Sequence, residues 1–338
     1  MKKIDLIKLG MVVGVFVLSY FCLFLTSAIS QEIYPSKDIT FICASNPGGG
    51  TDIAARGMAP FFSKYLKELS PGAKGGDMKV KNIPGASHEK AMISLRESKT
   101  DGYTIGDFIG GNIYKFNYGD TKLPFDVREF SWLFCTGEQQ RILICNKKKF
   151  ATWEEMIAAS KKEPLILICS SVGSSQHLET IFLKELVKIP GKLAFSGGTS
   201  ASVSAIMRGD GDVSLVSYDS VSALVESKEV NVLMTVTRER LLPQAPTIKE
   251  KGFPDALKYI GSRSSNRMVI GPPKLDPEPK QKILAALKKM VADPGYQAFC
   301  QKTGTKLDPV FGEDLRGEVV EYAKFLDEMA PTLKKYGL

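Results

Sequence analysis

The chain has 338 residues, with 45 Lys and Arg against 37 Asp and Glu, and a net charge of +8. Hydrophobic residues make up 43% and charged residues 24%, which is typical of a globular protein of about two domains and excludes disordered and collagen-like chains. Only two histidines occur, and no block of five basic residues, so we expect neither a histidine-rich metal or catalytic centre nor a nucleic-acid-binding protein.

Residues 1–30 predict a secretory signal peptide. Three lysines within the first eight residues precede an apolar run over residues 9–25, and Ala28 and Ser30 are the small residues expected before a cleavage site. The alternative is an uncleaved membrane anchor, because 17 apolar residues approach the length of a spanning helix. We expect cleavage and export to the periplasm as a soluble chain that begins near Gln31.

Five widely spaced cysteines remain after residue 30. Their spacing matches neither a CxxC motif nor a disulfide framework. Cys43, Cys145 and Cys169 lie in apolar runs that are typical of strands, so we expect buried small hydrophobic residues there. One disulfide between an unassigned pair stays open, because the expected compartment is oxidising.

The first strand–loop–helix unit begins at residue 39. A short apolar run over residues 39–44 predicts a buried strand, and the loop from Asn46 to Gly50 leads into a helical pattern. Thr51 or Asp52 is the expected N-cap of that helix. Glycines allow a sharp turn, and the N–H groups at a helix start can bind a carboxylate or phosphate, so this loop is a candidate anion site.

Two units of the same kind occur in the middle of the chain. One has a strand at 165–170, a loop at 172–175 and a helix at 176–188; the next has a strand at 192–195, a loop at 196–200 and a helix at 201–208. A strand at 212–218, a helix at 221–227 and a strand at 230–236 continue the alternation. This pattern predicts an open α/β sheet with ligand loops at the carboxyl ends of strands. Each loop alone could be a plain turn, but three placed alike favour anion binding.

The motifs of common enzymes are missing from the sequence. There is no P-loop, no GxGxxG, no GxSxG elbow, no HExxH and no paired Cys/His set. His177 falls in the first turn of a predicted helix, where it either donates to a ligand carboxylate or is a polar surface residue. His88 has no acid nearby and is expected to be structural or solvated. We therefore expect no cofactor, no metal and no catalysis.

Eight segments occur in the order found in one known family: Tyr34-Pro35-Ser36, PGGGTD (47–52), NIPGA (82–86), DGYTIG (101–106), LPFDVREF (123–130), GSSQHL (173–178), FSGG (195–198) and VLMTVTRERLLPQAPTIKEKGFP (232–254). Through them the chain resembles the extracytoplasmic solute receptors of tripartite tricarboxylate transporters, often called the Bug family. The resemblance covers nearly the whole chain from about residue 34. It implies a type II-like periplasmic-binding-protein fold, with two α/β lobes of mostly parallel sheets, two crossovers and a ligand between the lobes.

The resemblance also implies domain limits and site residues. Lobe 1 is expected to comprise residues 31–134 and 238–338, and lobe 2 residues 135–237. The residues that match the family's ligand loops are Gly49, Gly50, Thr51 and Asp52 in lobe 1, and Gly173, Ser174, Ser175, His177, Gly197, Gly198 and Thr199 in lobe 2.

Five further residues are considered because of their position. Asn46 replaces the family's small or apolar residue and is expected to contact the ligand. Tyr218 and Asp219 follow a strand that should end at the cleft, so they could bind the far end of the ligand. Arg267, or its neighbour Arg263, stands where the family has an aromatic-containing strand; it either enters the cleft or lies on the surface.

The expected function is binding without chemistry. A monomeric receptor would close on a small organic carboxylate (a di- or tricarboxylate, an aromatic acid or an amino acid) and deliver it to the large and small membrane subunits of a transporter. An ionised Asp219 would favour a ligand with an ammonium group. Two alternatives stay open: a secreted α/β enzyme that acts on a small acid, and a receptor that serves a sensor kinase.

Overall fold

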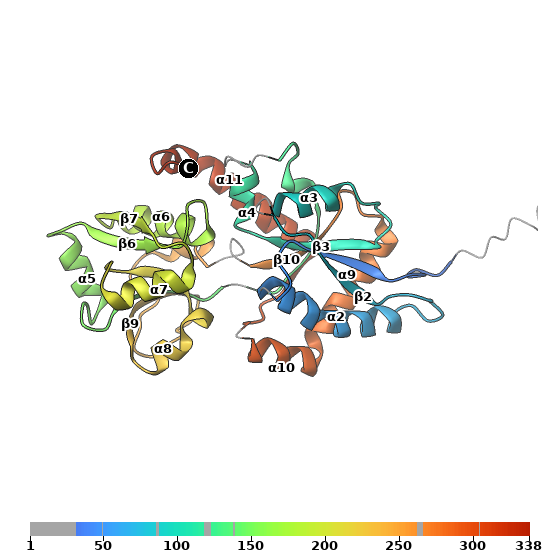
Figure 1. Ribbon diagram of the computed structural model, residues 1–338, viewed down its shortest axis with the longest axis horizontal. Coiled ribbons are helices and arrows are strands. Elements are labelled where there is room, and N and C mark those ends of the chain that lie inside the picture. Colours follow the sequence, from blue (N-terminus) through green and yellow to red (C-terminus); the bar gives the residue numbers. More distant parts are fainter. Residues whose placement is uncertain are drawn as a thin grey trace, which may run out of the picture.

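The computed structural model describes residues 32–48, 50–85, 88–117, 123–137, 139–261, 266–303 and 305–338. The expected signal peptide lies outside these residues, as do Gly49 and Arg263. The described chain forms two α/β lobes that lie side by side (Figure 1). Among the described helices, none combines the length and the apolar character that crossing a bilayer requires.

Lobe 1 is built on a six-stranded sheet with the order β11-β4-β10-β3-β1-β2. β1 (Ile39–Cys43) pairs in parallel with β2 (Met78–Asn82) and β3 (Thr104–Ile109), because helices α2 (Gly50–Glu68) and α3 (Glu89–Arg96) return the chain between them. The other three strands, β4 (Ser131–Cys135), β10 (Arg267–Gly271) and β11 (Val310–Phe311), pair antiparallel with their neighbours. The prediction of mostly parallel sheets is therefore wrong in detail. The chain enters β10 from lobe 2, so β10 runs antiparallel to its neighbours β3 and β4, which end at the boundary between the lobes.

Helices cover both faces of the lobe-1 sheet. Strand residues alternate between the faces, so Ile39 and Phe41 pack under α2, α9 (Pro277–Ala292) and α10 (Pro294–Lys302), whereas Ile42 packs on the opposite side. That opposite side holds α3, α4 (Asn112–Asn117) and the long α11 (Gly312–Lys334). The carboxyl end of β1 and the start of α2 lie at the side of lobe 1 that faces lobe 2 (Figure 1).

Lobe 2 contains a three-stranded and a two-stranded sheet. β5 (Arg141–Asn146) lies between β8 (Ser214–Ser217) and β9 (Val230–Val236), antiparallel to both, and β6 (Leu165–Cys169) pairs in parallel with β7 (Gly191–Phe195). A bridge between Leu167 and Val213 joins the two sheets. Around them lie α5 (Trp153–Ser160), α6 (Ser175–Val187), α7 (Thr199–Arg208) and α8 (Ser222–Glu226). The two predicted units at 165–188 and 192–208 are confirmed as β6–α6 and β7–α7.

The connections between the lobes lie next to each other. The Gln139 N–H, after β4, donates to the Gly261 carbonyl at 2.8 Å, before β10. The chain after β9 stays on lobe 2, because the Thr235 N–H donates to the Pro246 carbonyl and the Ile248 N–H donates to the Thr235 carbonyl. These contacts favour a second lobe boundary near Gly261 over the expected residue 237.

The last helix also reaches across the molecule. α11 begins on the lobe-1 sheet and runs towards α6 of lobe 2, as its red ribbon shows (Figure 1). Phe325 stacks on Tyr259 at a ring distance of 3.5 Å and meets Phe182 of α6 edge-on at 4.9 Å. Beyond the helix, the Tyr336 hydroxyl donates to Glu185 Oε1 at 2.5 Å. α11 is therefore a third link between the lobes, beside the two crossovers.

The predicted burial of cysteine is confirmed. Cys43, Cys145 and Cys169 lie inside β1, β5 and β6 and carry free thiols. Desolvation by burial is the main cause that raises the pKa of each thiol to about 11. These thiols act as small hydrophobic core residues.

Candidate functional site

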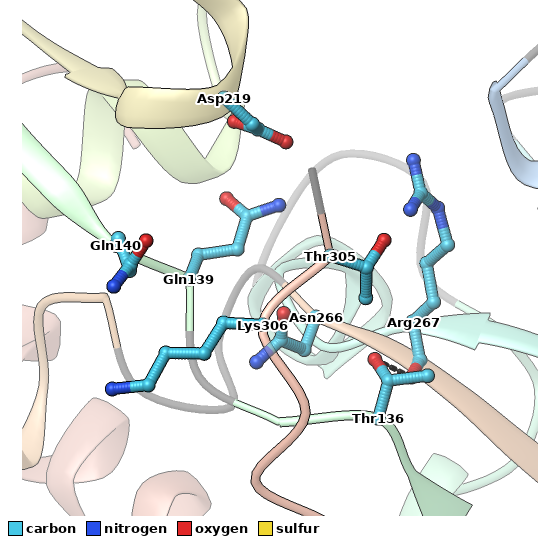
Figure 2. Close-up of a pocket in the computed structure, with 8 residues that line it drawn as sticks. All are labelled: Thr136, Gln139, Gln140, Asp219, Asn266, Arg267, Thr305 and Lys306. Carbon is cyan, nitrogen blue, oxygen red and sulfur yellow. Dashed lines mark hydrogen bonds between the residues drawn. The ribbon is translucent and has the colours of Figure 1, made fainter. Parts of the chain in front are cut away.

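A polar pocket, which we call the interlobe pocket, lies between the lobes. Its lining comes from both lobes and from their connections: Thr136, Gln139, Gln140, Asp219, Asn266, Arg267, Thr305 and Lys306. Figure 2 shows Asp219 of lobe 2 on the opposite side of the pocket from Arg267 and Thr305 of lobe 1. Because its walls belong to two lobes, this pocket changes shape whenever the lobes move.

A second space, the lobe-1 chamber, adjoins the interlobe pocket, since Thr136, Arg267 and Thr305 line both. The chamber has a volume of about 40 Å³ and is bounded by the sheet and by helices α2 and α10. Most of its wall is apolar: Phe41, Ala54, Ala55, Met58, Phe134, Met268, Val269, Tyr296, Phe299 and Cys300. Its polar groups are those of Thr51 and Asp107 and of the three shared residues. A space of this volume accepts a few water-sized groups but not an aromatic ring.

Asp107 is the acidic group of the chamber, and sequence reasoning missed it. Its side chain is 3% exposed; Oδ1 accepts the Ala44 N–H at 2.7 Å, whereas the buried Oδ2 has no partner among the described residues. Burial raises the pKa of this carboxyl to about 6, although the Ala44 amide and the charge of Arg267 act in the opposite direction. A lone acid within the apolar strand TIGDFI was the available signal.

Arg267 is the basic group of the same chamber. It pairs with Ile109 in the sheet while Val269 pairs with Asp107, so Arg267 and Asp107 lie on one face of neighbouring strands. Among the described residues, no carboxylate forms an ion pair with the Arg267 guanidinium. Of the two positions expected for Arg267, the structure shows the one in the cleft.

Asp52 stabilises the predicted loop of lobe 1 through hydrogen bonds to its carboxylate. α2 begins at Gly50, so Thr51 and Asp52 lie in its first turn and the N-cap prediction is wrong. The Asp52 carboxylate accepts hydrogen bonds from the Gly48 N–H at 2.9 Å, from Arg56 Nε at 2.9 Å and from Asn82 Nδ2 at 2.8 Å. These donors, Arg56 first, lower the pKa of Asp52 to about 2. Its oxygens are thus engaged within the loop, whereas Thr51 lines the chamber and Asn46 is exposed.

The two predicted loops of lobe 2 are hydrogen-bonded to each other. The Gly197 N–H donates to the Ser170 carbonyl at 2.6 Å. Ser174 is the N-cap of α6; its Oγ accepts the His177 N–H at 3.2 Å and donates to the Ser171 carbonyl. Gly198 is the N-cap of α7, and the first helical residues are Ser175 in α6 and Thr199 in α7. The positive ends of two helices therefore start from one bonded pair of loops.

His177 lies inside this pair of loops. Its side chain is fully buried, its Nδ1 accepts the Gly173 N–H at 3.1 Å, and its ring meets Phe195 edge-on at 4.8 Å. Burial lowers the pKa of the imidazole to about 4, so at pH 7 it is neutral, and its proton is on Nε2 because Nδ1 accepts. In this conformation His177 shapes the loop and has no surface to offer to a ligand.

Tyr218 and Asp219 form a short 3-10 turn with Ser220 after β8. The Tyr218 N–H donates to the Gln140 carbonyl at 2.8 Å, which ties the turn to the first connection between the lobes. The exposed Asp219 carboxylate accepts the Ser220 N–H at 2.9 Å and lines the interlobe pocket. Of these two candidates, the structure brings Asp219 to the pocket. In the described chain, no group of three or more His, Cys, Asp or Glu side chains is arranged to hold a metal ion.

Comparison with known proteins gives a consistent result. The family model described as "Tripartite tricarboxylate transporter family receptor" matches residues 74–331. A UPF0065 protein of Bordetella pertussis is 23% identical over 328 residues, which cover 92% of this chain and 93% of that protein. Protein BugT of the same organism is 24% identical over 264 residues, covering 74% of this chain and 76% of BugT.

Solved structures share the fold. A TctC solute-binding protein from Polaromonas superposes with a TM-score of 0.73 at 19% identity, covering 87% of this chain and 99% of that one. The Rhodopseudomonas palustris protein Rpa4515, solved with adipate, has a TM-score of 0.66 at 20% identity and covers 88% and 98%. MatC of the same species, with bound malate, has a TM-score of 0.61 at 17% identity and covers 87% and 97%. The predicted periplasmic-binding-protein fold is confirmed.

Proposed function

The chain belongs to the receptor family of the tripartite tricarboxylate transporters, and from this premise we propose that it captures a small organic carboxylate between its lobes. Delivery to the large and small membrane subunits of such a transporter follows capture. Proteins of this family are periplasmic receptors, and export through the predicted signal peptide at residues 1–30 is part of the proposal. Rpa4515 with adipate and MatC with malate support the choice of a carboxylate.

The interlobe pocket is the observation that carries this proposal. It has Asp219 of lobe 2 on one side, Arg267 and Thr305 of lobe 1 on the other, and Gln139 at the connection between them, whereas Lys306 extends away from Arg267 towards Gln140 (Figure 2). Arg267 gives the lobe-1 wall a positive charge, which suits a carboxylate. The neighbouring crossovers allow the lobes to close over a bound ligand, and closure excludes water and strengthens the hydrogen bonds inside.

The loops of lobe 2 supply the second half of the proposed site. α6 and α7 begin at Ser175 and Thr199, and the first N–H groups of a helix can bind a carboxylate. A charge-assisted hydrogen bond contributes about 1.5–3 kcal/mol, so a few of them suffice for tight capture of a carboxylate. Asn46, Gly50, Thr51, Ser175, Gly198, Thr199, Tyr218 and Asp219 remain proposed ligand residues. The N–H groups of Gly173 and Gly197 and the Ser174 hydroxyl donate within the loops, so we assign these three residues, with the buried Asp52 and His177, to loop shape.

Native mass spectrometry of freshly purified protein, followed by a thermal-shift screen, tests the proposal. We expect a bound organic acid, and stabilisation by about 2.7 kcal/mol when that acid is present at 100 times its dissociation constant. No shift with any dicarboxylate, aromatic acid or amino acid would contradict the proposal. Uptake of the labelled acid by cells with and without the receptor distinguishes a transporter partner from a sensor kinase.

The alternative of a secreted enzyme needs a nucleophile that is hydrogen-bonded to a base. Neither described imidazole is hydrogen-bonded to a serine hydroxyl: His88 Nδ1 lies 2.8 Å from Asn112 Nδ2, and His177 Nδ1 accepts the Gly173 N–H. We therefore expect the ligand to be recovered unchanged after hours of incubation. Its conversion to a product would favour the enzyme instead.

A further inference from the structure

The lobe-1 chamber combines an arginine without an ion pair and a carboxylate with one unused oxygen. The Arg267 guanidinium has no ion-pair partner among the described residues, and Asp107 Oδ2 has no hydrogen-bond partner there. Only 3% of the Asp107 surface remains accessible to solvent. A buried carboxylate oxygen that accepts no hydrogen bond is costly, so it calls for an explanation, and a donor group of a bound ligand is one.

The chamber is placed where a ligand in the interlobe pocket would reach it. Arg267, Thr136 and Thr305 line both spaces, so they form the border between the pocket and the chamber. Figure 2 shows the Arg267 side chain extending along the wall of the pocket, with Thr305 beside it. Asp107 lies further inside, on the strand next to that of Arg267 and on the same face.

We propose that the lobe-1 chamber is a subsite that recognises a hydrogen-bond donor close to a carboxylate of the ligand. In this subsite Arg267 pairs with the carboxylate, and Asp107 Oδ2 accepts a hydrogen bond from a hydroxyl or an ammonium group one or two bonds away. The ligand class is therefore a small hydroxy acid or amino acid. This inference rests on the proposed function, because it requires a carboxylate in the interlobe pocket.

Size and polarity of the chamber support a donor of this kind. About 40 Å³ admits a hydroxyl or an ammonium group with its carbon, but no ring. Most of the wall is apolar, so the methylene group of an unsubstituted acid would fit sterically while leaving Asp107 Oδ2 desolvated and without a partner. Sites that are built to hydrogen-bond a substituent discriminate strongly against analogues that lack it, for this reason.

Titration calorimetry with acids of matched length tests the subsite. The probes are three series that differ only in one substituent: succinate, malate and aspartate; glutarate, 2-hydroxyglutarate and glutamate; propionate, lactate and alanine. For the wild-type protein we expect at least one series in which the hydroxy or amino acid binds about ten times more tightly than the unsubstituted acid. Comparison within that series separates a hydroxyl from an ammonium as the preferred donor.

Two variants assign the preference to the named residues. Asp107→Asn keeps an acceptor for the Ala44 N–H but replaces the unused oxygen with a donor, so we expect the tenfold preference to fall below about threefold. Arg267→Gln removes the charge, and we expect all members of the series to bind at least about ten times more weakly. The matched controls are Asp314→Asn and Lys302→Gln, which change exposed residues of α11 and α10 by the same chemistry and should leave every dissociation constant within about twofold.

Each outcome decides the inference. Equal binding of substituted and unsubstituted acids in every series overturns it, and that comparison needs no variant to fold. An undiminished preference in Asp107→Asn overturns the role of Asp107. If none of the nine probes binds but another carboxylate does, the subsite is wrong and the proposed function survives. If no carboxylate binds at all, the proposed function itself falls.

Discussion

The two lobes prepare for a ligand in different ways. In lobe 2 most candidate groups, apart from Tyr218 and Asp219, are glycines, serines and a threonine, and their loops are hydrogen-bonded to each other, as between the Gly197 N–H and the Ser170 carbonyl. In lobe 1 the chamber contains charged side chains, Asp107 and Arg267, that have no ion pair between them or with other described residues. One lobe thus presents a finished backbone surface, and the other presents charges that still lack partners.

This difference separates two tasks within one binding site. Backbone N–H groups at helix starts bind any carboxylate, because they respond to charge and not to the rest of the molecule. Side-chain charges at fixed positions respond to which groups the ligand carries and where. We therefore propose that the lobe-2 loops and Arg267 supply affinity for a carboxylate, whereas Asp107 of lobe 1 selects among acids. The following variants test how each lobe is stabilised, in order of decreasing effect.

The largest effect is expected at the buried ion pair beside the lobe connections. Arg141 Nε lies 2.6 Å from Glu179 Oε2, the two side chains are 7% and 0% exposed, and Glu179 Oε1 accepts the Gly261 N–H. Arg141→Met leaves the Glu179 charge buried without its cation, which should lower the free energy of unfolding by about 3–5 kcal/mol in urea titrations.

A matched control lies at the end of the same strand. Lys147 follows β5 directly and pairs with Glu229, and both side chains are 44% exposed. Lys147→Met should cost less than about 1 kcal/mol, since exposed ion pairs contribute little. If Arg141→Met and Lys147→Met lower the free energy of unfolding equally, the buried pair of Arg141 and Glu179 stabilises lobe 2 no more than an exposed pair does.

The next largest effect is the change in stability with pH that the titration of Asp107 causes. Its pKa is about 6 in the folded protein against 3.8 for an ordinary carboxyl, so the folded state holds the proton to higher pH than the unfolded state. The free energy of unfolding should therefore fall by roughly 3 kcal/mol as pH rises from about 4 to about 6. Asp107→Asn should abolish this fall and be more stable than wild type at about pH 8, although it binds ligand less selectively.

Groups around Asp107 do not titrate in that pH range. Arg267 is a permanent cation, burial raises the pKa of the Cys43 thiol to about 11, and burial also raises the pKa values of Tyr296 and Cys300 on α10. Asp314→Asn on the exposed surface of α11 serves as the control and should follow the wild-type curve. A flat wild-type profile between about pH 4 and pH 6 would contradict the burial of an unpartnered carboxyl.

A smaller effect is expected in the glycine turn of lobe 2. Gly197 has φ +95°, which disfavours any residue with a Cβ, whereas the adjacent Gly198 has an extended backbone with φ 173° and open space where a Cβ would lie. Gly197→Ala should cost about 1–2 kcal/mol in chemical unfolding, and Gly198→Ala under about 0.5 kcal/mol. If the two variants lose equal stability, backbone geometry is not what fixes this loop.

The smallest effect is expected at the N-cap of α6. Ser174→Ala removes the acceptor of the His177 N–H and the bonds to Ser170 and Ser171, and should lower the free energy of unfolding by about 1 kcal/mol. Ser200→Ala, at an exposed position in the first turn of α7, should change it by less than about 0.5 kcal/mol. Equal stability of Ser174→Ala and wild type in thermal unfolding would argue against a preorganised loop.

Local signals account for the parts of the fold that the sequence could predict. The strand–glycine–helix units at 165–188 and 192–208 were recognisable because the apolar run of the strand, the turn residues and the helical pattern all lie within about 25 residues of each other. The same locality made the lobe-2 loops recognisable as similar strand-to-helix turns, and Asp219 could be placed because it directly follows a strand.

Contacts between distant residues account for what could not be predicted. Arg267 meets the chamber of Asp107 only because β10 returns from lobe 2 and inserts beside β3, a pairing that separates partners by about 160 residues in the chain. The pairing of Arg141 with Glu179 and the engagement of Asp52 by Asn82 are also long-range. The N-cap prediction failed because α2 begins at Gly50; Asp52 accepts hydrogen bonds from the nearby Gly48 and Arg56 and from the distant Asn82 within the first turn.

A crystal structure of the protein with the acid that co-purifies with it tests the central claim most directly. We expect closed lobes, a carboxylate on the starts of α6 and α7 or on Arg267, and a hydrogen-bond donor of the ligand at Asp107 Oδ2. Density for the acid away from Arg267, Asp107 and the first residues of α6 and α7 would contradict this claim, for example beside Arg208 and Asp210 at the other end of α7.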